Sequence, residues 1–153
     1  MPNTLVLRGL AVMLAVAVLS FAAAPVTGAM TMLLTPAGTK VGLSFLDPVD
    51  TGKAKAGDKV RFIVDHPVMV KGHVVIQKGA TLEGTVNAIG HPFPQNSGYA
   101  NIGSLTVTAV DDKSIVTLND VHVSAPLFGG DIRVKPGTHT VTTTRKDAYV
   151  SVK

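Results

Sequence analysis

The stretch that most limits the possible folds covers residues 59–90, where short apolar runs alternate with glycine-centred turns. Val60, Phe62 and Val64 recur at every second position, and Gly72 and Gly79 each follow a lysine between two such runs. A period of two places alternate side chains on one face of an extended strand, whereas a helix has a period of about 3.6. Glycine suits tight turns because it adopts positive φ at no steric cost. The segment therefore predicts three or four short β-strands.

The rest of the chain after residue 38 repeats this pattern, and no segment has a sustained helical period. Alternating or β-branched residues fill five further segments, at residues 39–46, 104–110, 114–123, 138–144 and 148–152. Within residues 114–123 the apolar positions change register near Asn119 and Asp120, which predicts a β-bulge. Short strands at this spacing are typical of an all-β fold. We expect a small antiparallel barrel or sandwich of about eight short strands.

The N-terminal residues 1–29 have the pattern of a secretory signal. Arg8 is their only charged residue, residues 10–24 form an uncharged and largely apolar run, and small residues follow. A basic start, an apolar centre and a small-residue exit are the features of an export signal. We expect a signal helix that is cleaved after Ala29. Cleavage after Ala24 is disfavoured, because it would leave Pro25 as the first residue of the mature chain. The mature part is then a single β-domain at residues 30–153, in the periplasm or outside the cell.

The alternative for the N-terminal segment is an uncleaved membrane anchor, which would associate the protein with the membrane. A membrane-spanning helix needs about 20 predominantly apolar residues. Pro25 and Gly28 interrupt the apolar run where such a helix would have to continue. Cleavage is therefore the favoured interpretation.

Composition excludes several classes of protein. The chain has no cysteine, so its fold depends on a hydrophobic core instead of disulfides, and a lipid-modified cysteine is excluded. Hydrophobic residues make up 46% of the chain, which is too many for a disordered protein. The formal net charge is +4, but the charges are interspersed and Trp is absent. A nucleic-acid-binding protein would show a clustered basic face with stacking aromatic residues, so we expect no nucleic-acid partner.

Three segments carry a resemblance to known proteins. They read AGTKV at residues 37–41, AKAGDKVRFIV at 54–64 and VKGHVVIQKGATLEGTV at 70–86. Together they resemble a class of small exported bacterial β-domains without assigned activity. Residues 76–84 are similar to the C-terminal β-barrel of the TrbI/VirB10 family of type IV secretion channels. The resemblance implies a β fold in the cell envelope and brings no catalytic residues with it.

No residue pattern indicates an enzyme. The chain has no G-x-S-x-G motif, and Glu83, its only glutamate, lies within a predicted strand. Nearly all of the aspartates fall at predicted turns, where the carboxylate usually closes the turn. Nucleophilic catalysis would need a Ser or Thr with a base and an orienting acid. The sequence therefore predicts a protein without catalytic activity or a cofactor.

Two groups of residues are candidates for binding. The stretch at residues 90–103 is rich in Pro, Gly and Asn and lacks strand periodicity, so it is the main predicted loop, and binding residues concentrate on loops. Its candidate residues are His91, Phe93, Gln95, Asn96, Tyr99 and Asn101. The expected partner is an envelope protein or a glycan, and the alternative is a plain connecting loop whose aromatic rings pack on the barrel. The second group, His66, Met69 and His73, suggests a periplasmic copper-binding protein as an alternative function, because His and Met ligands suit copper.

Overall fold

The computed structural model describes residues 28–91, 97–126 and 130–153, and the predicted signal helix lies almost wholly outside them. Within these ranges the chain forms fourteen β-strands, and no helix is long and apolar enough to cross a membrane. The all-β class is confirmed. The strands are β1 (Thr31–Thr35), β2 (Lys40–Phe45), β3 (Val49–Asp50), β4 (Lys59–Val64), β5 (Val68–Val70), β6 (His73–Ile76), β7 (Thr81–Gly90), β8 (Tyr99–Gly103), β9 (Thr106–Thr108), β10 (Ile115–Thr117), β11 (Val121–Ser124), β12 (Arg133–Val134), β13 (His139–Thr143) and β14 (Ala148–Val152).

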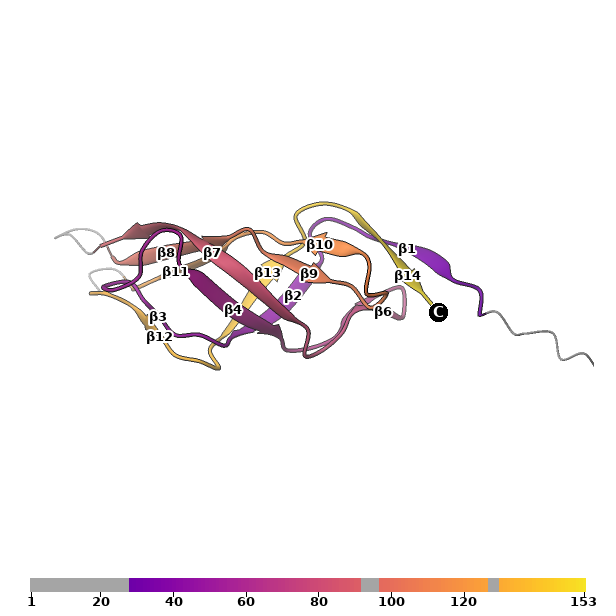
Figure 1. Ribbon diagram of the computed structural model, residues 1–153, viewed down its shortest axis with the longest axis horizontal. Coiled ribbons are helices and arrows are strands. Elements are labelled where there is room, and N and C mark those ends of the chain that lie inside the picture. Colours follow the sequence, from indigo (N-terminus) through magenta and orange to yellow (C-terminus); the bar gives the residue numbers. More distant parts are fainter. Residues whose placement is uncertain (1–27, 92–96, 127–129) are drawn as a thin grey trace, which may run out of the picture.

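A six-stranded antiparallel sheet forms the body of the molecule, in the order β11-β8-β7-β4-β2-β13 (Figure 1). Its two edge strands come together, because the residues just before β11 bond to the end of β13. Leu118 forms a bridge with Thr144, and the Asn119 amide donates a 2.8 Å hydrogen bond to the Thr143 carbonyl. The sheet is thus nearly closed and resembles a barrel.

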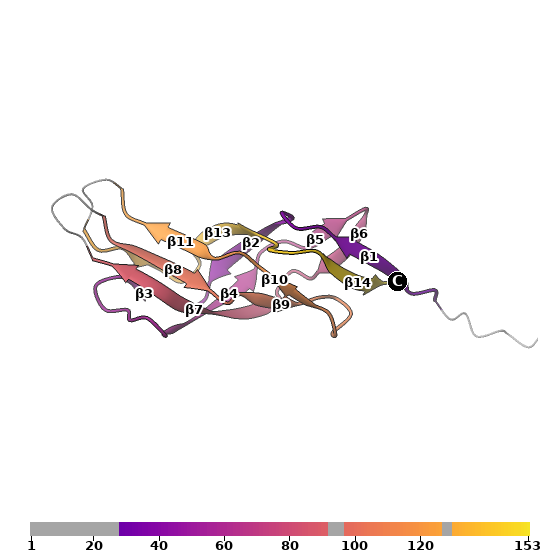
Figure 2. The same cartoon turned by 90° about the horizontal axis from the view of Figure 1, so that it is seen from above.

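Four two-stranded ribbons complete the fold, and they pair β1 with β14, β5 with β6, β9 with β10 and β3 with β12. The molecule is elongated. Its termini end holds β1, β14, the β5–β6 hairpin and the β9–β10 turn, and Gly28 and Lys153 both lie there (Figures 1 and 2). The opposite end, called the loop end, holds β3, β12 and the adjoining ends of β7, β8 and β11.

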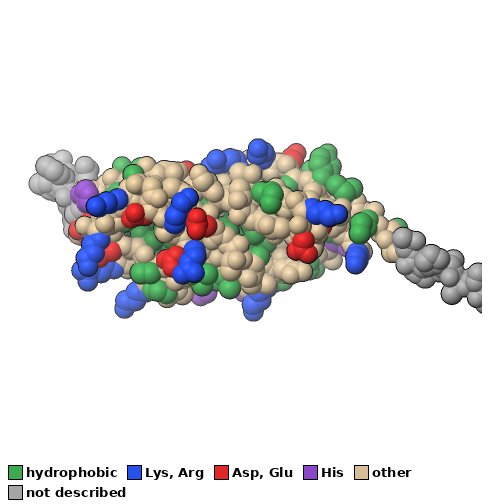
Figure 3. Space-filling model, viewed as in Figure 1, with side chains coloured by type: hydrophobic (Ala, Val, Ile, Leu, Met, Phe, Trp, Pro, Cys, Tyr) green, Lys and Arg blue, Asp and Glu red, His purple; other side chains and the backbone are tan. Residues whose placement is uncertain are grey.

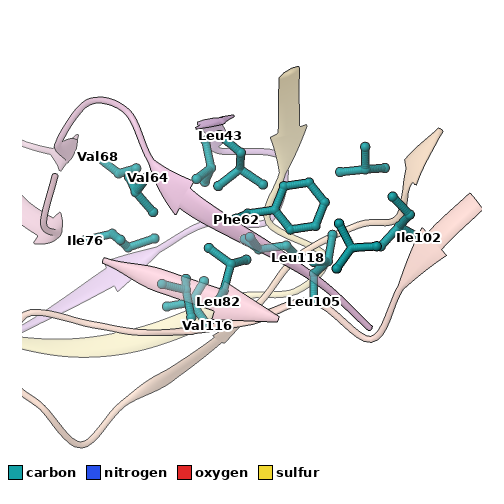
Figure 4. Close-up of a cluster of buried hydrophobic side chains, with 14 of the residues drawn as sticks. Leu43, Phe62, Val64, Val68, Ile76, Leu82, Ile102, Leu105, Val116 and Leu118 are labelled. Carbon is teal, nitrogen blue, oxygen red and sulfur yellow. The ribbon is translucent and has the colours of Figure 1, made fainter. Parts of the chain in front are cut away.

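The core confirms the alternation seen in the sequence. Val60, Phe62 and Val64 of β4 are buried, as are the alternate residues of β2 and of the segment around β9. Figure 4 shows Leu43, Phe62, Leu105 and Leu118 gathered between the strands of the barrel. The Phe45 and Phe62 rings lie with their centroids 4.7 Å apart. The buried cluster continues from the barrel into the termini end through Leu33 and Val150.

The number of strands exceeds the expected eight or so because one predicted segment divides in two and because four strands, β1, β3, β8 and β12, lie outside the predicted segments. Residues 114–123 divide into β10, which pairs with β9, and β11, which pairs with β8. The register change near Asn119 therefore marks a change of partner between two strands. The bulges lie elsewhere, between Val68 and Met69 and between Val86 and Ala88.

The turn chemistry follows the sequence closely. Lys71 and Gly72 connect β5 to β6, and both have positive φ, at 49° and 81°. Two successive positive φ angles are the signature of the type I′ turn that two-residue hairpins favour. Glycine meets this requirement without strain at the second position.

Candidate functional site

The loop end contains the described part of the predicted binding loop. Phe93, Gln95 and Asn96 lie outside the described residues. His91 directly follows β7 and is exposed, whereas Tyr99 and Asn101 belong to strand β8. Three of the six predicted residues can therefore be placed, and two of those three stand on a strand.

Tyr99 is held between two neighbours. It is paired with Gly90 across β7 and β8, and a Cβ atom on Gly90 would overlap the Tyr99 ring. The ring therefore lies against the glycine backbone, as aromatic residues do when they cover a glycine on a neighbouring strand. It also stacks on the His122 ring, with centroids 5.8 Å apart and an interplanar angle of 28°. Tyr99 is nevertheless 37% exposed, so part of it remains accessible to a partner.

His122 completes this arrangement and was not predicted from the sequence. It lies on β11, opposite Asn101 of β8, and its Nδ1 is hydrogen-bonded to the Asn101 side-chain oxygen. The sequence signal available was the outward position of His122 between buried or half-buried Val121 and Val123. Tyr99, Asn101 and His122 thus form an exposed, ordered cluster, which we call the Tyr99–His122 platform.

A second cluster, where β2 pairs with β13, contains a serine, an aspartate and a histidine. The Ser44 hydroxyl donates a 2.5 Å hydrogen bond to Asp65 Oδ1. His139 Nδ1 lies 2.9 Å from Asp65 Oδ2 and 2.8 Å from Ser44 Oγ. The three residues come from β2, the bend after β4, and β13, so the cluster joins three parts of the chain.

These are the residue types of a catalytic triad, but their geometry differs from one. In a triad the histidine uses Nε2 toward the serine and Nδ1 toward the acid. Here the same nitrogen, His139 Nδ1, faces both Ser44 and Asp65. The Ser44 hydroxyl donates to the carboxylate, and Ser44 is only 6% exposed. This arrangement suits a link between strands better than activation of a nucleophile.

The environment of Asp65 fixes its charge. Burial raises the pKa of the Asp65 carboxyl, but hydrogen bonds from Ser44 and His139, with the charges of His139 and His66, lower it by more. The net result is a pKa below the ordinary value for aspartate. Asp65 is therefore ionised at neutral pH, which strengthens both hydrogen bonds because charged partners bond more strongly.

We expect Asp65→Asn to reduce the free energy of unfolding by about 1–2 kcal/mol at pH 7, the usual range for loss of a hydrogen bond to a charged group. Because folding lowers the pKa of Asp65, its contribution is present above the unfolded pKa of about 3.9 and is lost as pH falls through the folded value. Urea unfolding of the parent and the variant at pH 7 and pH 3 measures this. A difference in stability that does not shrink at pH 3 would contradict the assignment.

The residues of the predicted copper site lie around the β5–β6 hairpin but on different sides. Met69 is opposite Val74, and His73 is opposite Val70. Since directly opposed residues share a face and neighbours alternate, Met69 and His73 point to opposite faces of the hairpin. His66 lies in the bend before β5. Met69 is 55% exposed and does not join the core. In the described ranges no three His, Cys, Asp or Glu residues are grouped to hold a metal, and copper binding stays a prediction.

A cleft of about 720 Å³ opens at the termini end. It lies between β6, the end of β14 and the β9–β10 turn, and its lining includes His73, Asp111, Lys113 and Lys153. The Asp111 carboxylate in its wall is occupied by hydrogen bonds from the turn and from β14. These hydrogen bonds hold the β9–β10 turn against β14, so this part of the cleft wall has a structural role.

Comparison with known proteins assigns no family, since no protein-family model, curated protein or solved structure matches the chain. The similarity of residues 76–84 to the TrbI/VirB10 barrel therefore stays a prediction. The functional argument consequently depends on the geometry of the chain itself.

Proposed function

We propose that this protein is an exported cell-envelope β-domain that binds a partner at its loop end and has no catalytic activity. The observation that carries the proposal is the Tyr99–His122 platform. Two stacked rings are held at the surface by Gly90 behind Tyr99 and by Asn101 beside His122. Rigid exposed aromatic side chains are common anchors in binding surfaces.

The chemistry of the platform fits the expected partners, an envelope protein or a glycan. Tyr and His combine apolar ring surface with polar atoms that donate or accept hydrogen bonds. Such groups can lie against a sugar ring or an extended peptide and still bond its polar atoms. Because the rings stand on strands of the barrel, little conformational entropy is lost when they bind.

The Ser44 cluster supports the absence of catalytic activity. Its serine is buried, and its hydroxyl proton is directed to Asp65. A hydrolase of this type would need the imidazole placed to accept that proton. The cluster acts instead as a contact that joins β2 and β13 to the bend after β4.

We expect His122→Ala to reduce capture of the partner from an envelope extract by about ten-fold or more, as hot-spot truncations do. His73→Ala is the matched control, because it removes another exposed histidine at the opposite end. Pull-down followed by mass spectrometry and a glycan array separates a protein partner from a sugar. Melting temperatures of both variants verify that the fold is intact. Equal capture by the parent and His122→Ala would show that the platform is not the binding site.

A further inference from the structure

The outer face of the β1–β14 ribbon is apolar although it is exposed. Leu34 is paired with Tyr149 and Met32 with Ser151. The inward side chains Leu33, Thr35, Val150 and Val152 are buried against the rest of the molecule. The outward side chains Met32, Leu34 and Tyr149 remain 60%, 37% and 62% exposed.

This face extends to the start of the described chain. Met30, just before β1, is 70% exposed. We call Met30, Met32, Leu34 and Tyr149 the apolar face. Figure 3 shows several apolar side chains at this end of the molecule, with basic and acidic side chains beside them. The outward positions within β1 and β14, which are Met32, Leu34, Tyr149 and Ser151, carry no charge, and Lys153, directly after β14, is the first charged residue that follows on this side. Contiguous exposed apolar side chains on a soluble domain usually mark a contact with a partner or a membrane.

The neighbouring sequence favours a membrane as the occupant. The uncharged run at residues 10–24 ends four residues before Gly28, where the described chain begins. A run of this kind engages a bilayer whether it acts as an export signal or as an anchor. Strand β1 is the first described strand after this run, so it lies next to the bilayer for as long as the run stays attached. Tyr149 also suits the boundary between lipid and water, where amphipathic rings concentrate.

We propose that the apolar face docks onto the surface of a lipid bilayer. The side chains insert mainly by burial of apolar surface, because the members of the face are uncharged and Lys153 is the one cation directly beside them in the register of the ribbon. The termini end then lies at the membrane and the loop end points away from it, since the two are at opposite ends of the elongated molecule (Figure 2). This inference concerns a different surface from the Tyr99–His122 platform and does not depend on what that platform binds.

The absence of cysteine makes a direct test possible, since each introduced cysteine is the only one in the chain. The full chain, as Met32→Cys, Tyr149→Cys or Val141→Cys, is labelled with a polarity-sensitive dye and mixed with phosphatidylcholine vesicles that contain a lipid-borne quencher. Val141 is the matched control, because it is 66% exposed and apolar but lies on β13 of the barrel. An interfacial face lies about 5–10 Å within the headgroup boundary. We therefore expect quenching at positions 32 and 149 to be several-fold stronger than at position 141.

The same experiment distinguishes the other occupants and the other causes of membrane binding. Adding Leu34→Ser to Met32→Cys should weaken the quenching without lowering the melting temperature, whereas 1 M salt should leave it unchanged. Equal quenching at positions 32 and 141 would show that the chain is held at the membrane without this face and would overturn the proposal. A Met32→Cys disulfide between two chains, with a dimer mass by light scattering, would assign the face to a second copy and would also overturn it.

Discussion

Replacing Phe62 with alanine is expected to reduce the free energy of unfolding by about 3–5 kcal/mol, the range for removal of a fully buried aromatic side chain. Phe62 is 0% exposed and is paired with Phe45 on β2 and with Leu82 on β7. The centroids of the Phe62 and Phe45 rings are 4.7 Å apart. The three central strands therefore all border the cavity that the substitution would leave, and none can fill it without moving the others.

Val141→Ala is the control for this prediction. Val141 also belongs to the six-stranded sheet but is 66% exposed, so its truncation should change stability by no more than about 0.5 kcal/mol. Equilibrium unfolding in urea gives both values, and an unchanged m-value indicates that the unfolding transition exposes the same surface. A loss below about 1 kcal/mol for Phe62→Ala would mean that the barrel core is packed differently.

Much of the barrel could be predicted because its strands follow local rules. Alternation alone identifies the buried side chains Val60, Phe62 and Val64, and the lysine–glycine pair at residues 71–72 identifies a hairpin. Strand partners are not local, since they depend on pairing between distant segments. The division of residues 114–123 between two partners was therefore outside what periodicity can predict.

The candidate sites could likewise be predicted only in part, because their residues come together through pairing between distant segments. Ser44 occupies the outward register of β2, yet it is buried because Asp65 and His139, 21 and 95 residues away, cover it. Tyr99 and Asn101 could be selected from the composition of their loop, but His122 could not. It joins them only through the register of β8 with β11, and no feature near His122 in the sequence specifies that register.

Asp111→Asn is expected to produce the second large loss of stability, about 2–3 kcal/mol at pH 7, because a carboxylate with several hydrogen bonds would be replaced. The Asp111 carboxylate accepts hydrogen bonds from the Lys113 amide, the Ser114 amide and the Ser114 hydroxyl. It also accepts a 3.1 Å hydrogen bond from the Ser151 amide of β14. An amide has one oxygen, so its NH₂ group would face at least one of these donors. The β9–β10 turn and β14 would then be held less tightly.

The pH dependence of this loss follows from the pKa of Asp111. Burial raises the pKa, but the hydrogen bonds from Ser114, Lys113 and Ser151 together outweigh it and hold the pKa far below the ordinary value. The contribution of the carboxylate to stability is therefore complete above its unfolded pKa of about 3.9 and is lost progressively as pH falls from that value toward the folded pKa. Urea unfolding at pH 7 and pH 3 should show a difference between the parent and Asp111→Asn that shrinks at the lower pH.

Asp112→Asn is the matched control for Asp111, since it makes the same change one residue away. Asp112 is exposed and has a φ of 57°, a conformation that asparagine also adopts readily. Its substitution should change stability by no more than about 0.5 kcal/mol, and equal losses for the two variants would contradict the role given to Asp111. Amide hydrogen exchange adds a local test. Because Ser151 donates to Asp111, only Asp111→Asn should speed exchange along β14. That strand supports Tyr149, so Asp111 also helps to hold the apolar face in place.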